Sequence, residues 1–300
     1  MYTFRSVPRN ELEGFQSFTY PYFRALLQGA AVDAAGVGAY LMDRPVGFAL
    51  GQILPEKRGG ELCSVFVAPD HRRCGIGSRL LEDLERELSA RCIEFVTTTY
   101  ATYNRNAAAV ERMLQKAGWP APEPRLQVCT GEWPVVSAAT WMRRRDFPPE
   151  YEVFPWSELR PEERRHIEDC AARHEWFPAG LNPFWRQERT SAALSLGLRF
   201  HGKLAGWSIV HHYDAESAQF VSLFVDPPLQ RLGRAVPLLA QSIWAMQDTP
   251  MHRIVCEVAL DNTPMLHFAK RRLQPYCTSY GLILRAWKPV AVEAAVAMGV

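Results

Sequence analysis

The chain has 300 residues, of which 48% are hydrophobic, enough for two domains of ordinary size with a core each. Its formal net charge of +2 is small for this length, so nucleic acid and anionic membranes are not expected as partners. No apolar run reaches membrane-spanning length and the start, Met1 to Arg5, lacks the apolar segment of a secretion signal, so we expect a cytoplasmic protein.

Hydrophobic patterns and turn residues divide the first half of the chain into alternating strands and helices. A short strand opens the chain and an aromatic-rich helical stretch follows over residues 10–28. Asp43-Arg44-Pro45 is typical of a hairpin turn. The predicted strands cover residues 2–7, 38–42, 46–54, 61–67, 93–100 and 125–130, and the further helices cover 78–87 and 104–116.

The stretch from Glu61 to Glu87 reads as a buried strand, a turn at Pro69, a glycine-bearing loop and an amphipathic helix. Gly75 and Gly77 allow the backbone to approach a ligand closely. The first N–H groups of the helix point out of its end, where the helix dipole favours anions. This arrangement predicts a site for a phosphate or pyrophosphate.

The second half of the chain repeats the first at an offset of 158 residues, since Val67 corresponds to Val225 and Gly75 to Gly233. A repeat of this length and register indicates the tandem duplication of one domain. Three arginines and Asp146 precede Pro148 and Pro149, which is typical of a linker. We therefore predict two domains, 1–146 and 147–300.

The cysteines and histidines indicate no metal site. The seven cysteines are odd in number and widely spaced, without a C-x-x-C pair, as is typical of buried thiols in a reducing compartment. Cys74 differs from the other cysteines because it lies at a predicted helix N-terminus, where a thiol can be reactive, although an inert structural role suits it as well. His211 and His212 fall in a predicted strand, which turns one of them inward, and no third ligand accompanies them at metal spacing.

The loop residues resemble the acetyl-coenzyme A signature of the GNAT superfamily of N-acetyltransferases. Val67, Pro69, Arg72, Gly75 and Gly77 read V-x-P-x-x-R-x-x-G-x-G, and the second copy fits the pattern Q/R-x-x-G-x-G/A. The order of the predicted elements also matches that family. The resemblance covers nearly the whole chain and implies an α/β fold with a mixed sheet, in two tandem GNAT-type acyltransferase domains. It further implies a sheet that splays between its fourth and fifth strands.

The same resemblance implies acetyl-CoA as the cofactor, with its pantetheine arm on the fourth strand and its pyrophosphate on the loop. The residues expected to bind it are Val65, Phe66, Val67, Arg72, Arg73, Cys74, Gly75, Ile76, Gly77, Ser78 and Asn104. A second cofactor site would use Val225, Gln230, Arg231, Gly233, Arg234, Ala235 and Asn262. Asn104 and Asn262 equally fit helix N-caps.

Direct attack of an amine on the thioester needs a group that accepts a proton and one that protonates the thiolate. Glu61, at the head of the signature strand, stands where glutamate bases occur in the histone-acetylating branch of the family; it could also be a solvated strand-end carboxylate. The family tyrosine on the helix after the fifth strand is missing here. Tyr103 or Tyr100 could replace it, although packing or surface roles suit both as well.

The first copy is predicted to be the catalytic one, because the second has Gln219 in place of Glu61 and Ala235 in place of Gly77. The second would then be a weak cofactor binder or a wall of the acceptor site, which residues 15–31 and 176–188 would shape. The expected acceptor is an amine of a small molecule or peptide. The sequence indicates neither which amine it is nor an oligomeric state. A non-catalytic acyl-CoA-binding protein and an acyltransferase of the mycothiol-synthase type are the alternatives.

Overall fold

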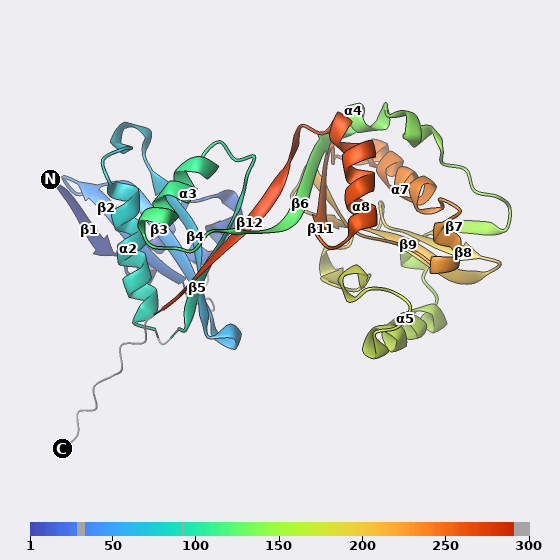
Figure 1. Ribbon diagram of the computed structural model, residues 1–300, viewed down its shortest axis with the longest axis horizontal. Helices are drawn as coiled ribbons and strands as arrows, with labels where there is room; N and C mark the ends of the chain where they lie inside the picture. Colours follow the sequence, from blue (N-terminus) through green and yellow to red (C-terminus); the bar gives the residue numbers. More distant parts are fainter. Residues whose placement is uncertain (29–33, 92, 291–300) are drawn as a thin grey trace, which may run out of the picture. The chain divides into compact units, whose positions relative to one another are not determined.

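The computed structural model describes residues 1–28, 34–91 and 93–290 and divides into two compact units. The first unit consists of residues 1–125 and the chain from residue 283 onward, and the second of residues 126–282. Each unit contains a mixed sheet with helices packed on it (Figure 1). This architecture confirms the predicted α/β fold class.

The first unit has the strand order β1-β2-β3-β4-β5-β12, and only β4 and β5 are parallel neighbours. Its strands are β1 (Tyr2–Ser6), β2 (Ala34–Leu41), β3 (Arg44–Leu54), β4 (Gly59–Val67), β5 (Phe95–Ala101) and β12 (Ser279–Pro289). Its helices are η1 (Arg9–Phe18), η2 (Pro21–Phe23), α1 (Arg24–Gln28), η3 (Pro55–Lys57), η4 (Pro69–His71), α2 (Ile76–Ser89) and α3 (Ala107–Lys116).

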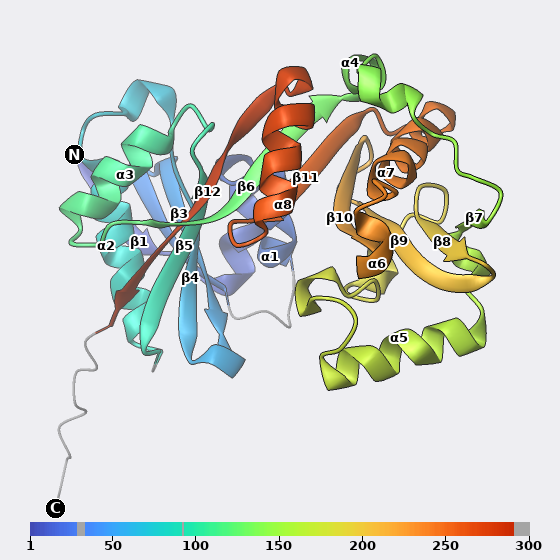
Figure 2. The ribbon, with the colours of Figure 1, turned by 45° about the vertical axis from the view of Figure 1, so that its right-hand side comes forward.

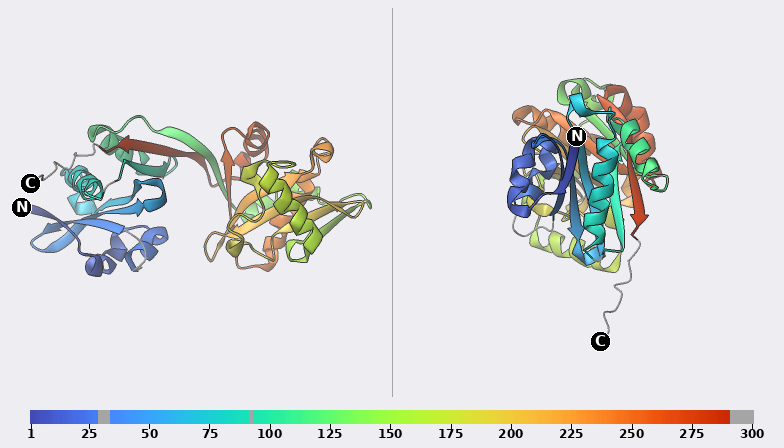
Figure 3. Two further views of the ribbon diagram at one scale, coloured as in Figure 1. Left: turned by 90° about the horizontal axis from the view of Figure 1, so that it is seen from below. Right: turned by 90° about the vertical axis from the view of Figure 1, so that its left-hand side faces the viewer.

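Helices cover both faces of the sheet of the first unit. Figure 3 shows α2 and α3 on one face and η1 with α1 on the other. The leucines predicted to share one side of α2 are all buried against the sheet: Leu80, Leu81, Leu84 and Leu88. The helical stretch predicted for residues 10–28 is present, but most of it is 3₁₀-helix instead of α-helix.

The second unit has the strand order β6-β11-β10-β9-β8-β7. Its strands are β6 (Glu123–Glu132), β7 (Tyr151–Pro155), β8 (Leu196–Phe200), β9 (Lys203–His212), β10 (Ser217–Val225) and β11 (Arg253–Ala259). Its helices are α4 (Trp133–Ser137), η5 (Thr140–Arg143), η6 (Trp156–Glu158), α5 (Pro161–Arg173), η7 (Ala179–Leu181), η8 (Gln187–Arg189), α6 (Pro227–Gln230), α7 (Ala235–Trp244), η9 (Ala245–Asp248), α8 (Thr263–Phe268), η10 (Ala269–Leu273) and η11 (Gln274–Tyr276).

Three clusters of buried side chains stabilise the described part of the second unit, and two of them include the helices α5, α7 and α8. Helices α7 and α8 pack on one side of its sheet, in a cluster with Val210, Ile254 and Cys256. Helix α5 and the segment around Phe177 pack against Trp207 on β9 in the other cluster. Figure 2 shows α5 and α7 on this unit. Among the described residues of the whole chain, no helix is long and apolar enough to cross a membrane.

The last strand of each repeat completes the unit that contains most of the other repeat. Strand β6, from the first repeat, pairs antiparallel with β11 in the second unit. Strand β12, from the end of the chain, pairs antiparallel with β5 in the first unit, from Ile283 opposite Ala101 to Pro289 opposite Phe95. The compact units therefore differ from the continuous domains 1–146 and 147–300 that the sequence predicts.

Strand β12 is tied to the first unit by side chains as well as by its backbone. Ala286 is buried in the core under α2. Lys288 donates hydrogen bonds to Oε2 of Glu85 at 2.8 Å and to the carbonyl oxygen of Ala117 at 2.7 Å. The sheet of the first unit is thus complete only with residues that lie near the end of the chain.

Candidate functional site

The parallel strands β4 and β5 separate along their length. Backbone pairing joins Gly59 to Phe95, Gly60 to Val96 and Glu61 to Thr97, and it stops there although β4 continues to Val67. Within the described residues, the β4 edge from Val65 to Val67 that faces away from β3 has no strand partner. Unpaired strand groups of this kind can bind an extended ligand through backbone hydrogen bonds.

A bulge lies just beyond the point of separation. The register between β3 and β4 shifts by one residue, so Cys63 has no partner on β3. The second unit repeats both features, because pairing of β10 with β11 stops at Phe220 opposite Cys256 and the register with β9 shifts at Val221. The two units thus share the splayed geometry, with the bulges at corresponding positions of the repeat.

The loop after β4 leads directly into α2. Gly75 has φ = 77° and Arg73 has φ = 66°, and both lie in the left-handed region. Gly75 is the N-cap of α2, and no side chain caps the helix there. The first N–H groups of α2 have no carbonyl partner one turn earlier, so they can bind an anion at this end. The side chains of Arg72, Arg73 and Cys74 are exposed beside them.

The two signature glycines have different structural roles. Gly75 needs its left-handed backbone, and nothing lies within 4 Å of where a Cβ would stand. Gly77 has ordinary helical backbone, and an added Cβ would meet Sδ of Met113 at 3.6 Å, which is normal contact. The backbone therefore favours glycine at position 75, whereas position 77 has room for a small side chain.

Arg72 and its counterpart Gln230 make the same contact in the two units. Nε of Arg72 donates to the carbonyl oxygen of Val67 at 2.9 Å, and Nε2 of Gln230 donates to that of Val225 at 2.8 Å. Each side chain thereby holds its loop against the end of its strand. This contact explains why arginine and glutamine can both occupy the position, and the guanidinium of Arg72 keeps further donors for a ligand.

The loop of the second unit is less open to an anion. Gly233 keeps the left-handed backbone, with φ = 69°. The guanidinium of Arg234 lies 4.9 Å from the ring centre of Tyr151 in the core, and its Nε is buried without a partner among the described residues. Pro237 is buried in the first turn of α7 and offers no N–H group. The second loop thus has fewer donors than the first.

Glu61 lies where β4 and β5 separate. It is half-buried, and burial raises the pKa of its carboxyl group above the ordinary value, against the opposing effect of the positive charges of Lys57 and Arg285. A raised pKa brings a carboxylate closer to the range in which a general base works at neutral pH. This geometry suits a proton acceptor, and the role remains a prediction.

The tyrosines near the start of α3 differ in environment. Tyr103 lies in the turn after β5 and is 44% exposed. Tyr100 lies on β5, and its hydroxyl donates to Oε1 of Glu111 at 3.4 Å. Burial, together with Glu111, raises the pKa of Tyr100 to about 12. Tyr103 is the more exposed of the two side chains.

Of the two asparagines predicted as possible helix N-caps, one caps its helix and the other does not. Asn262 is the N-cap of α8, and its side chain accepts a hydrogen bond from the backbone of Met265. Asn104 is not an N-cap, so that prediction is wrong: α3 begins after Asn106, and Oδ1 of Asn104 accepts from the backbone N–H of Asn106 at 3.0 Å. An asparagine that makes this local turn holds the loop before the helix.

The aromatic segment from residue 176 to 188 packs within the second unit. Nε1 of Trp176 donates to Asp226, and Nε1 of Trp207 donates to the carbonyl oxygen of Leu181. Ser222 also donates to Leu181 at 2.7 Å. The segment therefore covers one face of β9 and β10.

Arg285 is a site residue that the sequence did not predict. It lies on β12 and donates from Nε to Oγ1 of Thr97 at 3.1 Å, next to Glu61. Its position near the end of the second repeat gave no signal that it belongs to the first unit. Only the pairing of β12 with β5 reveals it.

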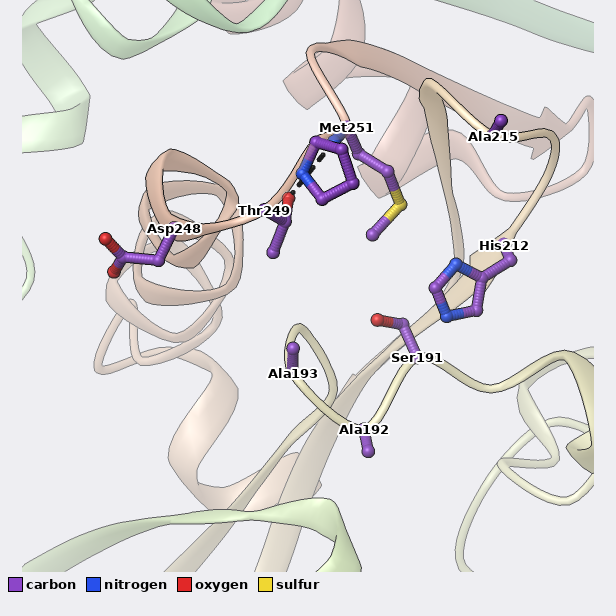
Figure 4. Close-up of a pocket in the computed structure, with 9 residues that line it drawn as sticks. Ser191, Ala192, Ala193, His212, Ala215, Asp248, Thr249 and Met251 are labelled. Carbon is purple, nitrogen blue, oxygen red and sulfur yellow. Dashed lines mark hydrogen bonds between the residues drawn. The ribbon is translucent and has the colours of Figure 1, made fainter.

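A cavity of about 340 Å³ lies elsewhere in the second unit (Figure 4). Figure 4 shows His212, Asp248 and Thr249 on its lining, with Thr249 accepting a hydrogen bond from the backbone of Met251. None of its lining residues belongs to either predicted cofactor loop. The cavity therefore adds nothing to the candidate site.

The comparisons with known proteins agree with this geometry. The model of the acetyltransferase (GNAT) family matches residues 4–119 and again 144–273. A tandem GNAT protein from the clavulanic acid biosynthesis pathway is 15% identical, with a TM-score of 0.60 over 97% of this chain and 99% of that one. A GCN5-related N-acetyltransferase from Sphaerobacter thermophilus is 14% identical, with a TM-score of 0.62 over 96% of each chain. A search of curated proteins finds no match. At these identities the structures show similarity of fold alone.

Proposed function

Because the chain belongs to the acetyltransferase (GNAT) family, we propose that its first unit is an N-acetyltransferase that uses acetyl-CoA to acetylate an amine of a small molecule or peptide. The proposal is carried by strand β4, which joins a carboxylate at one end to a helix N-terminus at the other. Strand β4 separates from β5 after Glu61, and the loop that follows it ends at Gly75, the N-cap of α2. A thioester arm along β4 would thus connect an anion site to a carboxylate.

In the proposed reaction, residues of the first unit bind the pyrophosphate, accept a proton from the amine and donate a proton to the sulfur. Bound acetyl-CoA supplies the thioester, whose C–S bond breaks as the C–N bond to the amine forms. Residues 72–78 bind the pyrophosphate through backbone N–H groups and the two arginines. Glu61 accepts the proton that the amine loses, and Tyr103 gives a proton to the sulfur of the leaving thiol. An amine such as lysine, with a pKa of about 10.4, is mostly protonated at neutral pH and needs such an acceptor.

We propose that the second unit is a diverged copy that does not transfer acetyl groups. Gln219 cannot accept a proton where Glu61 can, and Pro237 removes a donor from the first turn of α7. The alternatives are a non-catalytic acyl-CoA-binding protein and an enzyme whose working half is the second unit. Cofactor stoichiometry separates these possibilities from the leading one.

The test is calorimetric titration of the full chain with acetyl-CoA, comparing Gly77→Glu with the matched variant Ala235→Glu. A glutamate in the first turn of a helix is compatible with the helix dipole, but it repels a pyrophosphate. We expect one site, lost in Gly77→Glu and kept in Ala235→Glu. The opposite pattern would move the working site to the second unit. No binding to the unmodified chain would end the acetyltransferase proposal.

A further inference from the structure

The guanidinium group of Arg285 is held beside the candidate base without a carboxylate partner. Its Nε donates to Oγ1 of Thr97 at 3.1 Å, and Thr97 itself donates to the backbone of Ala286 at 3.1 Å. Arg285 forms no ion pair with any residue in the described part of the chain, and its side chain is half-buried. The four N–H groups on its two terminal nitrogens therefore remain for a ligand.

The strand register places this group next to Glu61. Thr97 is the direct neighbour of Glu61 across β4 and β5. Residues paired across neighbouring strands point to the same face of a sheet, so a guanidinium anchored on Thr97 lies on the face that carries the side chain of Glu61. The charges of Arg285 and Lys57 both reach Glu61, where each opposes the rise that burial causes in its pKa.

The charges around Glu61 bear on the kind of amine that can bind. Arg285 and Lys57 are the two cations that act on Glu61. Their positive charges disfavour a simple ammonium ion beside them. An amine that also carries a carboxylate would be attracted, because the planar guanidinium binds a carboxylate through two parallel hydrogen bonds.

The coenzyme phosphates are not the natural ligand of Arg285. They are proposed to bind at the loop beyond Val67, at the other end of the separated part of β4. A strand rises about 3.3 Å per residue, so the distance from Glu61 to Val67 is about 20 Å. Arg285 lies at the Glu61 end, where the acceptor amine must be.

We infer that Arg285 is a specificity-determining residue of the first unit, which binds the carboxylate of an acceptor such as a free amino acid while Glu61 faces its amine. This inference rests on the proposed function and deepens it by naming the class of acceptor. A consequence is that the exchanged strand β12 supplies the acceptor site of the first unit with a residue that lies outside the first repeat.

The test compares the free L-amino acids with their amides, which lack the carboxylate charge, as probes of the full chain. Acetyl transfer is followed by release of the coenzyme thiol, and binding of the same probes is followed by calorimetry with coenzyme A present. We expect at least one amino acid to be bound and acetylated about 10- to 100-fold better than its amide, the usual range for a hydrogen bond to a charged group.

Arg285→Gln should remove this preference by raising the KM of the amino acid while kcat changes little, and Arg285→Lys should keep part of it. Arg58→Gln is the matched control, because it removes an exposed arginine paired with Glu94 in the same unit, and it should keep the preference. If no amino acid exceeds its amide, or if Arg285→Gln retains the difference, the inference is overturned. Failure of the proposed function is read separately, from the absence of acetyl-CoA binding.

Discussion

Glu61 is the residue on which the proposed chemistry depends. Substitution of Glu61 by glutamine keeps the shape of the side chain but removes the proton acceptor, so we expect kcat to fall by about 10²- to 10⁴-fold while acetyl-CoA affinity is unchanged. In the unmodified protein, kcat/KM should rise with pH through a group whose pKa lies above the ordinary carboxyl value, because burial raises the pKa of Glu61.

Steady-state rates across pH would check this prediction, with Glu56→Gln, an exposed glutamate on η3, as the control that retains activity. A Glu61→Gln enzyme with an unchanged rate would exclude Glu61 from the mechanism.

His211 links the stability of the second unit to pH. It is the inward member of the histidine pair, at 1% exposure, and neither ring nitrogen has a hydrogen-bond partner among the described residues. Burial lowers its pKa, the nearby Arg189 and Arg186 lower it further, and Glu188 opposes them. The unfolded chain therefore binds a proton near pH 6.5 that the folded chain does not, and stability should fall as the pH drops below that value.

Urea unfolding between pH 5 and 8 would measure the effect. We expect His211→Phe to flatten the loss of unfolding free energy on the acid side, since phenylalanine cannot be protonated and suits the ring of Trp185 stacked on this site. His212→Gln, at the exposed neighbour, should leave the slope as it is. An equal slope in His211→Phe and the unmodified protein would contradict the assignment.

The start of α2 is an element whose two glycines should respond oppositely to alanine. Gly75→Ala places a Cβ on left-handed backbone and should lower the unfolding free energy by about 1 kcal/mol. Gly77→Ala adds a good helix former with room for its methyl group, and should leave the unfolding free energy unchanged or raise it by up to about 1 kcal/mol.

Urea titration of both variants checks the signs, and acetyl-CoA titration should find weaker binding in each. A destabilised Gly77→Ala chain would mean that the fold itself, and not a ligand, requires glycine at that position.

At the scale of the whole molecule, the exchanged strands β6 and β12 make each unit depend on a segment from the other repeat. Residues 1–146 lack β12, so the edge of β5 and the core around Leu88 would lose a neighbouring strand. Residues 1–125 joined to residues 283–300 by a Gly/Ser linker contain every strand of the first unit. We expect the joined chain to fold and bind acetyl-CoA, and residues 1–146 to be less stable or to aggregate.

Circular dichroism and calorimetry of the two chains measure this difference. Equal stability and equal binding in both would mean that β12 contributes nothing essential to the first unit.

The sequence by itself determined the features that depend on local pattern. The leucine spacing of α2, the hairpins and the repeated glycine loop are each encoded within a few neighbouring residues, so the α/β class and the duplication could be predicted. The point at which β4 and β5 stop pairing, at Glu61 and Thr97, depends on two segments that are distant in the sequence. Only the resemblance to a family predicted that these strands separate.

Only the tertiary structure decided which strand completes which unit. Strands β6 and β12 each mix apolar and polar residues and each follow the helical segment of their own repeat, so nothing local distinguishes the two ways of pairing them with β5 and β11. Strands pair through backbone groups that every residue carries, so these groups do not select one partner strand over another. The partner of each strand is therefore determined by the long-range packing of side chains. That choice brings Arg285 to Glu61, although 224 positions separate them in the sequence.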